Sequence, residues 1–268
     1  MTETIAAACR TVLETADPHL KVKAARRAAR EWRAGRLAWA FDVAMPDHPA
    51  RGDRPPLLAP SRMKKRGRAG SQATRIAMIH AVAHIEYGAI DLAADVAGRF
   101  GGLFPRAFAD EWMRVLAEEA MHFALVSRRL RALGATYGDL PAHDGLWQAA
   151  GETAHDALAR LAIVPLVLEA RGLDVTPAMA ERFAAAGDTA MARILARILS
   201  DEIGHVATGL RWFAHLCATR RIVPATTWQN LVALHFRGRL KPPFNASARD
   251  RAGLTTDWYL PIALAPQG

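Results

Sequence analysis

Four short stretches of acidic residues and histidines, each set in apolar helix-forming sequence, constrain what this chain can fold into. In chain order they are Glu86, Glu119-x-x-His122, Glu169 and Glu202-x-x-His205. The interval from the single to the paired glutamate is 33 residues in both halves. Glutamates in an apolar core carry a prohibitive desolvation cost unless their charge is compensated. The pattern therefore predicts a dinuclear metal site in a four-helix bundle, where two helices each supply Glu and two supply Glu-x-x-His.

The chemistry of these side chains indicates which metals they would bind. Residues three positions apart lie on one helix face, so Glu119 and His122 can hold the same ion, as can Glu202 and His205. Mixed carboxylate and imidazole ligands suit iron or manganese better than zinc or calcium. We predict two iron ions, with manganese or a mixed pair as alternatives. The competing interpretation, salt-bridged glutamates and core histidines, would require four coincidences of face and spacing.

A third Glu-x-x-His sequence, Glu152 to His155, shows that one such pair is weak evidence. It falls in the first turn of a helix expected over residues 149–171, where a glutamate is favourable because of the helix dipole. His155 lies about 21 Å along the axis from Glu169 at the helical rise. We therefore interpret this pair as structural.

Acidic residues precede both paired glutamates and are candidates to support the metal-bound histidines. Such histidines donate their second N–H to a carboxylate, a carbonyl or water. Asp201 is expected to accept from His122, and Glu118 from His205, across the bundle. The alternative is that both acids are solvated.

Two residues beside Glu86 are further candidates for a place near the metal. His84 points away from Glu86 on a helix and is expected to be a hydrogen-bonded structural histidine rather than a ligand. Tyr87 is either a redox-active tyrosine or an ordinary packed one.

Composition and periodicity predict an all-α fold. Alanine and leucine dominate, and apolar residues recur at helical spacing around the predicted ligands. Pro165 should kink its helix one turn before Glu169. Residues 46–70 read as an extended basic strap, and the last thirty residues as an irregular wrap. The expected helices cover 2–16, 20–41, 71–99, 105–133, 149–171, 177–186, 188–220 and 224–238.

These elements divide into three expected parts. Residues 1–70 form N-terminal helices and the strap, packed on the bundle. Residues 71–220 form the metal-binding four-helix bundle. Residues 221–268 form a C-terminal helix and the wrap.

Charge and targeting signals bear on partners and compartment. The net charge is +9, and most of the excess lies in residues 21–36 and 62–75. These basic stretches could bind a nucleic acid, but the favoured explanation is an arginine-rich surface exposed to solvent. We expect no membrane span, because apolar runs fall short of about 18 residues, and no signal peptide, because the first residues lack a basic, apolar and small-residue order. Cys9 and Cys217, far apart in the sequence, suggest free thiols in the cytoplasm.

Three motif blocks resemble a known family. They are residues 79–86 (IHAVAHIE), residues 89–92 (AIDL) and residues 201–205 (DEIGH). They are similar to the bacterial ferritin-like proteins of domain-of-unknown-function family 455, over about residues 20 to 240. The resemblance implies a ferritin-like fold and a metal site more than a reaction. The ligand pattern also resembles, more distantly, the ferritin-like di-iron tRNA hydroxylase.

Three functions fit these observations. The favoured one is an O2-activating oxidase or hydroxylase with two iron ions and an unidentified substrate. The second is an iron-handling ferroxidase or a peroxide-scavenging protein. The third is a bundle whose metal serves stability alone, so the sequence does not decide whether the chain is an enzyme.

Overall fold

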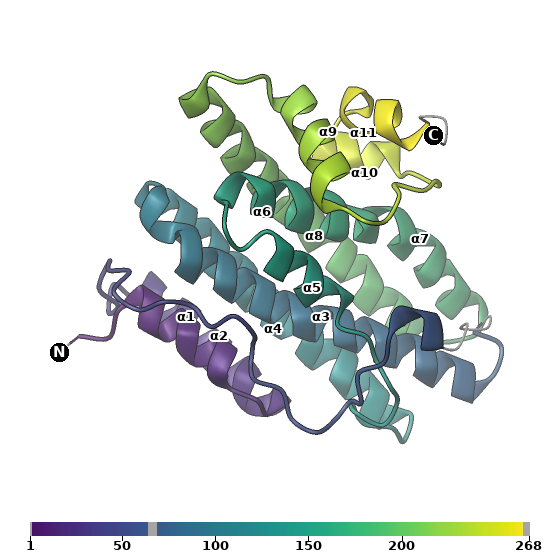
Figure 1. Ribbon diagram of the computed structural model, residues 1–268. Helices are drawn as coiled ribbons and strands as arrows, with labels where there is room; N and C mark the ends of the chain where they lie inside the picture. Colours follow the sequence, from purple (N-terminus) through teal and green to yellow (C-terminus); the bar gives the residue numbers. More distant parts are fainter. Residues whose placement is uncertain (1, 64–68, 265–268) are drawn as a thin grey trace. The chain divides into compact units, whose positions relative to one another are not determined.

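The computed structural model describes residues 2–63 and 69–264, and these are almost entirely helices and connecting loops (Figure 1). Within those ranges β pairing is limited to the isolated bridges Thr4–Ala38 and Leu57–Ala142. The all-α prediction is confirmed. The chain forms two compact units, residues 1–147 with 182–194 and residues 148–181 with 195–268. The predicted three-part division stays a prediction.

The first unit is built on two long helices, α3 (Gln72–Phe100) and α4 (Arg106–Ala132), which pack against each other. Two shorter helices, α1 (Ile5–Glu14) and α2 (Pro18–Arg33), pack on this pair. Helix α3 starts in a capping box, in which Ser71 and Thr74 satisfy each other's backbone N–H groups.

The N-terminal helices differ from their expected bounds at both ends. Thr4, not Thr2, caps α1, because its hydroxyl accepts from the N–H of Ala7 at 3.1 Å. Helix α2 stops at Arg33, well short of residue 41, because Gly35 turns the chain with a φ of +69°. Among the described residues between Gly35 and α3, the regular structure is η1 (Pro60–Arg62) and the isolated bridges at Ala38 and Leu57. Residues 64–68 of the predicted strap lie outside the described residues.

One basic residue expected on the surface is internal. Lys21 is fully buried in α2 and pairs with Asp91, which is also fully buried in α3. Arg51, from the segment before α3, pairs with the other oxygen of Asp91. This cluster ties α2 and the loop to α3, so the basic stretch that begins at residue 21 is not wholly solvated.

Helix α3 is the core helix of the first unit. Within the described ranges, the segment Gln72–Leu103, which includes η2 (Gly101–Leu103), has the length and hydropathy of a membrane span. In the folded protein, 72% of its most apolar window is buried. Burial in a bundle accounts for the hydropathy without a bilayer.

The second unit includes the part of α8 (Thr189–Arg220) from residue 195 onward, together with several shorter helices. Trp228 of α9 donates its indole N–H to the carbonyl of Ala162 in α6 at 3.0 Å, which fixes α9 on α6. The other described elements of this unit follow α6 along the chain. The elements are α6 (Ala157–Ile163), η3 (Val164–Glu169), α7 (Ala170–Ala185), α9 (Pro224–His235), α10 (Ala246–Arg251) and α11 (Thr256–Ala263).

The expected helix over 149–171 is wrong in two ways. The chain breaks after α5 (Gly145–Glu152), and Asp156 begins α6 by accepting from the N–H groups of Leu158 and Ala159. At the other end, Gly172 does not stop the helix, because it keeps helical backbone rather than the positive φ of a C-terminal cap. Helix α7 therefore continues through Pro177 without a separate helix there.

The C-terminal segment is more ordered than an irregular wrap. Asn245 caps α10, since its side chain accepts from the N–H of Ala248. Arg249 in α10 is buried and binds both carboxylate oxygens of Asp174, at 2.8 and 2.7 Å. This paired contact fastens α10 to α7 within the second unit.

Candidate metal centre

In the first unit, α3 and α4 bring three of the predicted ligands together. Glu86, Glu119 and His122 are buried, with exposed fractions of 4%, 0% and 0%. Nδ1 of His122 lies 3.3 Å from Oε2 of Glu86 and 3.5 Å from Oε2 of Glu119. One ligand atom from each lies within 4.8 Å of the others, so a single ion could contact all three. We name these residues the first half-site.

The electrostatics of the first half-site favour a positive charge. Burial lowers the pKa of His122, but the carboxylates of Glu119 and Glu86 have the larger combined effect. The net result is a pKa raised to about 11. Without metal, the imidazole therefore holds a proton between two carboxylates. A divalent cation would take over that role with the imidazole as a neutral ligand.

In the second unit, η3 and α8 bring the other three predicted ligands together. Glu202 and His205 are buried and Glu169 is half-buried. Nδ1 of His205 lies 3.6 Å from Oε2 of Glu202. Ligand atoms of the three residues again lie within 4.8 Å of one another. We name these residues the second half-site.

Glu169 is the last residue of the π-helical segment η3, which contains Pro165, while the predicted kink at Pro165 stays a prediction. The N–H of Ala170 donates to the carbonyl of Pro165, five residues earlier, so the turn is wider than an α-helical one. Pro165 lacks an N–H and cannot continue α-helical bonding. π-helical turns within α-helices are frequent at functional sites. The widened turn shifts Glu169 from the face that an unbroken helix would give it.

Helix α8 approaches this turn closely within the second unit. A Cβ placed on Gly209 would overlap Cβ and Cγ of Pro165. Gly209 lies four residues after His205, one turn along α8. The absence of a side chain there lets the helix carrying Glu202 and His205 lie against the turn that carries Glu169.

The donor sets fit a metal. Each half-site has two carboxylates and one imidazole, a set suited to iron or manganese. The described residues hold Cys9 and Cys217 as free buried thiols, and neither half-site includes them. Burying two carboxylates per half-site is costly unless cations compensate them.

The acids next to the paired glutamates bind arginines on their own helices. Glu118 accepts from Arg114 at 2.9 Å, and Asp201 accepts from Arg197 at 2.7 Å. Both arginines are about half exposed. Their predicted role as acceptors for the ligand histidines stays a prediction.

His84 and Tyr87 take different places beside Glu86. His84 lies 2.9 Å from the hydroxyl of Tyr137 through Nδ1 and 3.1 Å from the carbonyl of His143 through Nε2. Tyr87 is buried and donates to the carbonyl of Ala16 at 3.0 Å. Tyr137 lies in the connection after α4 and belongs to no motif, so nothing in the sequence pattern singles it out. Its hydrogen bond to His84 is visible only in the fold.

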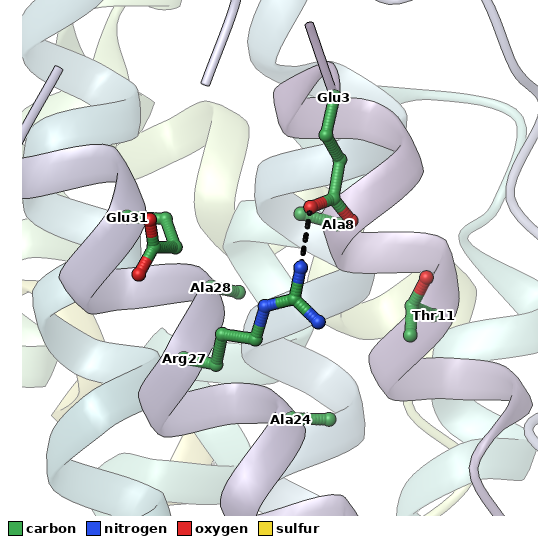
Figure 2. A pocket seen from close by; sticks show the side chains of 7 residues that line it. All are labelled: Glu3, Ala8, Thr11, Ala24, Arg27, Ala28 and Glu31. Atoms are coloured by element: carbon green, nitrogen blue, oxygen red, sulfur yellow. Dashed lines mark hydrogen bonds and ion pairs between the residues drawn. The ribbon is translucent and has the colours of Figure 1, made fainter. Parts of the chain in front are cut away.

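A hollow between α1 and α2 is lined by residues other than those of the first half-site (Figure 2). Glu3, Thr11, Arg27 and Glu31 line it with three alanines, and Arg27 binds Glu3 across it at 3.3 Å. It contains none of the predicted ligands, and its exposed charges suit a solvated surface.

The third Glu-x-x-His pair has a different environment. Glu152 ends α5, rather than starting a helix as expected, and binds the exposed Arg237 at 2.8 Å. His155 is exposed, with its ring 5.7 Å from that of His235. We expect Glu152→Ala and His155→Ala to bind as much metal as the wild type, because neither side chain belongs to a half-site. Elemental analysis of folded proteins reconstituted with Fe(II) checks this, and loss of metal in His155→Ala would contradict it.

Comparisons with known proteins agree with the motif resemblance at the level of the family. A chain from Haemophilus influenzae, described as an uncharacterized protein, is 43% identical over 222 residues, covering 78% of this chain and 76% of its own length. No solved structure gives a significant match. The family of proteins of unknown function DUF455 matches residues 14–260. The chain therefore belongs to the DUF455 family.

Proposed function

We propose that the two half-sites join into one dinuclear iron centre and that the chain is an O2-activating oxidase or hydroxylase. The observation that carries the proposal is the repetition of one donor set. Each compact unit holds a glutamate and a Glu-x-x-His pair whose ligand atoms lie within 4.8 Å of one another. This is the ligand set of ferritin-like carboxylate bundles.

In the proposed bundle, α3, α4, the α6–α7 segment and α8 are the four helices. Glu86 and Glu169 supply one carboxylate each, and the paired residues supply a carboxylate and an imidazole each. Two bound ferrous ions would supply the electrons for reducing O2. The protein's part is to fix the ligands from four helices, to exclude bulk water from Glu119, His122 and His205, and to keep the imidazoles deprotonated toward the metal.

The proposed partners follow from this site and from the surface. O2 or peroxide would be a reactant with an organic substrate that remains to be identified. A nucleic acid stays disfavoured, because part of the basic stretch over residues 21–36 is neutralised: Arg27 pairs with Glu3, and Arg30 and Arg36 pair with Glu31. The buried free thiols of Cys9 and Cys217 fit the proposed cytoplasmic location.

The direct test is metal content followed by O2 consumption. After anaerobic reconstitution with Fe(II), we expect about two iron ions per chain, as in carboxylate bundles of this type. Exposure to O2 should then consume O2 in a single turnover, followed with an oxygen electrode. Less than about half an ion per chain after reconstitution would contradict the metal site.

The same experiment separates the alternative functions. Repeated oxidation of added Fe(II) without any organic substrate would favour a ferroxidase. Faster reaction with peroxide than with O2 would favour peroxide scavenging. Bound iron that raises the melting temperature but reacts with neither oxidant would favour a structural metal.

A further inference from the structure

The outer side of α9 in the second unit carries large apolar side chains that face solvent. The opposite side of the helix is packed, because Trp228 and Val232 are buried and Trp228 bonds to α6. Val223, directly before α9, is 66% exposed, and Leu234, near its end, is 75% exposed. These two residues are 11 positions apart, close to three helical turns, so they lie on the same side of α9.

Exposed apolar residues are concentrated at this helix. Nine large hydrophobic side chains are exposed in the described ranges, and Leu234 is the most exposed of them. Three of the nine, Ile222, Val223 and Leu234, fall within residues 222–234. Single exposed apolar residues need no explanation, but a group of them beside charged residues is typical of an interaction surface.

The charges that accompany these residues in the sequence are all positive. Residues 220–243 contain five arginines and lysines and no aspartate or glutamate. Two of the five bind acids of other elements: Arg220 binds Asp156 at 3.1 Å, and Arg237 binds Glu152 at 2.8 Å. The other three are exposed and have no acidic partner in the part of the chain that the structure describes. They are Arg221, Arg239 and Lys241.

Arg221 has a backbone conformation that favours glycine. Its φ is +55°, in the left-handed region, where the chain leaves α8. The N–H groups of Arg221 and Ile222 donate to the carbonyls of Ala218 and Cys217, and glycine is the usual residue at such a helix end. The strain at Arg221 is therefore better explained by a role of its side chain than by the fold.

We propose that α9 and its flanking residues bind the anionic surface of a lipid membrane, with the helix lying in the plane of the interface. The α9 surface consists of three apolar and three unpaired basic residues: Ile222, Val223, Leu234, Arg221, Arg239 and Lys241. The apolar side chains enter the boundary between head groups and acyl chains, as those of an interfacial helix do. The basic side chains bind anionic head groups. The inference is independent of the proposed dinuclear centre.

Two other occupants match the α9 surface less well. A second copy of the chain in a twofold dimer would place the same positive patch on both sides of the interface. Single-stranded nucleic acid binds to exposed aromatic rings on which its bases stack. Trp228 of α9 is fully buried, and the exposed large side chains of this surface are aliphatic. An anionic bilayer matches both the aliphatic side chains and the positive charge.

The first experiment measures co-sedimentation of the full chain with lipid vesicles. Vesicles of phosphatidylcholine and phosphatidylserine should bind the wild type, vesicles of phosphatidylcholine alone should bind it weakly, and added salt should reduce the binding. Leu234→Gln should bind at least about tenfold more weakly, since it removes a leucine from the apolar boundary. Equal binding to both kinds of vesicle, or unchanged binding by Leu234→Gln, would overturn the proposal.

Leu103→Gln is the matched control for the apolar contact. Leu103 is 67% exposed and lies in η2 of the first unit, outside the α9 surface. The variant makes the same chemical change and should bind the phosphatidylserine vesicles as the wild type does. Equal losses of binding in Leu103→Gln and Leu234→Gln would show that no particular surface is used, which contradicts the proposal.

Arg221→Gly separates membrane binding from folding. Glycine adopts the left-handed conformation without strain, so the variant should melt at or above the temperature of the wild type. Loss of the charge should nevertheless weaken binding to phosphatidylserine vesicles about fivefold. Arg33→Gln removes an exposed arginine from α2 in the first unit and should bind as the wild type does. If both variants lose binding equally, net charge alone is responsible and the α9 surface is refuted.

The remaining occupants are tested on the same proteins without lipid. A single-stranded RNA probe that binds the wild type but not Arg239→Gln, combined with no binding to vesicles, would assign the surface to nucleic acid. A dimer in analytical ultracentrifugation that dissociates in Leu234→Gln would assign it to a second copy of the chain. Either result would overturn the proposal, whereas a monomer that binds anionic vesicles and not RNA would support it.

Discussion

The Glu169→Ala protein should fold normally and lose metal, falling from about two ions per chain to no more than about one, if the half-sites form one dinuclear centre. Glu169 is half-buried at the end of η3, and its removal leaves Glu202 and His205 as the remaining donors of the second half-site. If its carboxylate bridges the ions, both should be lost. Elemental analysis after Fe(II) reconstitution measures the outcome.

Thermal unfolding with and without metal shows whether the substitution acts on the site or on the fold. A ligand that binds only the folded state stabilises it, by about 2.7 kcal/mol at a free concentration 100 times its Kd. Fe(II) should therefore raise the melting temperature of the wild type and of Glu152→Ala more than that of Glu169→Ala. The metal-free Glu169→Ala protein should melt at or above the melting temperature of the metal-free wild type, since removing one of several close carboxylates relieves repulsion. A Glu169→Ala protein with full metal content and full O2 reactivity would contradict the site.

The ligand pattern was readable from the sequence because it depends on local spacing. Three residues along a helix make neighbours, so Glu119 with His122 and Glu202 with His205 were predictable as pairs. Glu86 and Glu169 stood out as charges at apolar positions. Contacts between distant segments were not predictable in this way. The hydrogen bond between Tyr137 and His84 joins a loop to α3 across 53 residues of sequence. Helical periodicity does not predict such a contact.

The all-α fold and the long helices α3 and α4 followed from periodicity, but several breaks did not. Glycine and proline mark helix ends only where the backbone uses their special conformations. Gly35 does so and ends α2, whereas Gly172 lies inside α7. Lys21 belongs to the basic stretch that was expected to be solvated, and lysine is rarely buried unless it is paired. Its partner, Asp91, lies 70 residues away.

The Gly209→Ala substitution should both destabilise the protein and weaken metal binding. A methyl group at this position would overlap the ring of Pro165, and a proline ring has no rotamer with which to move aside. Overpacking of this kind costs about 1–3 kcal/mol in free energy of unfolding. The strain can be relieved by moving α8 away from the π-helical turn. That movement would separate Glu202 and His205 from Glu169.

Gly172→Ala is the matched control for Gly209→Ala, because it makes the same chemical change in the second unit. Gly172 is helical, and a Cβ there would meet nothing within 4 Å. Alanine in a helix interior is favoured over glycine by about 0.5–1 kcal/mol, so this variant should be as stable as the wild type or more so and should keep its metal. Urea unfolding and iron affinity, measured on both variants, give the comparison. If Gly209→Ala matches Gly172→Ala in both measurements, close contact between α8 and the turn at Pro165 is not what positions the second half-site.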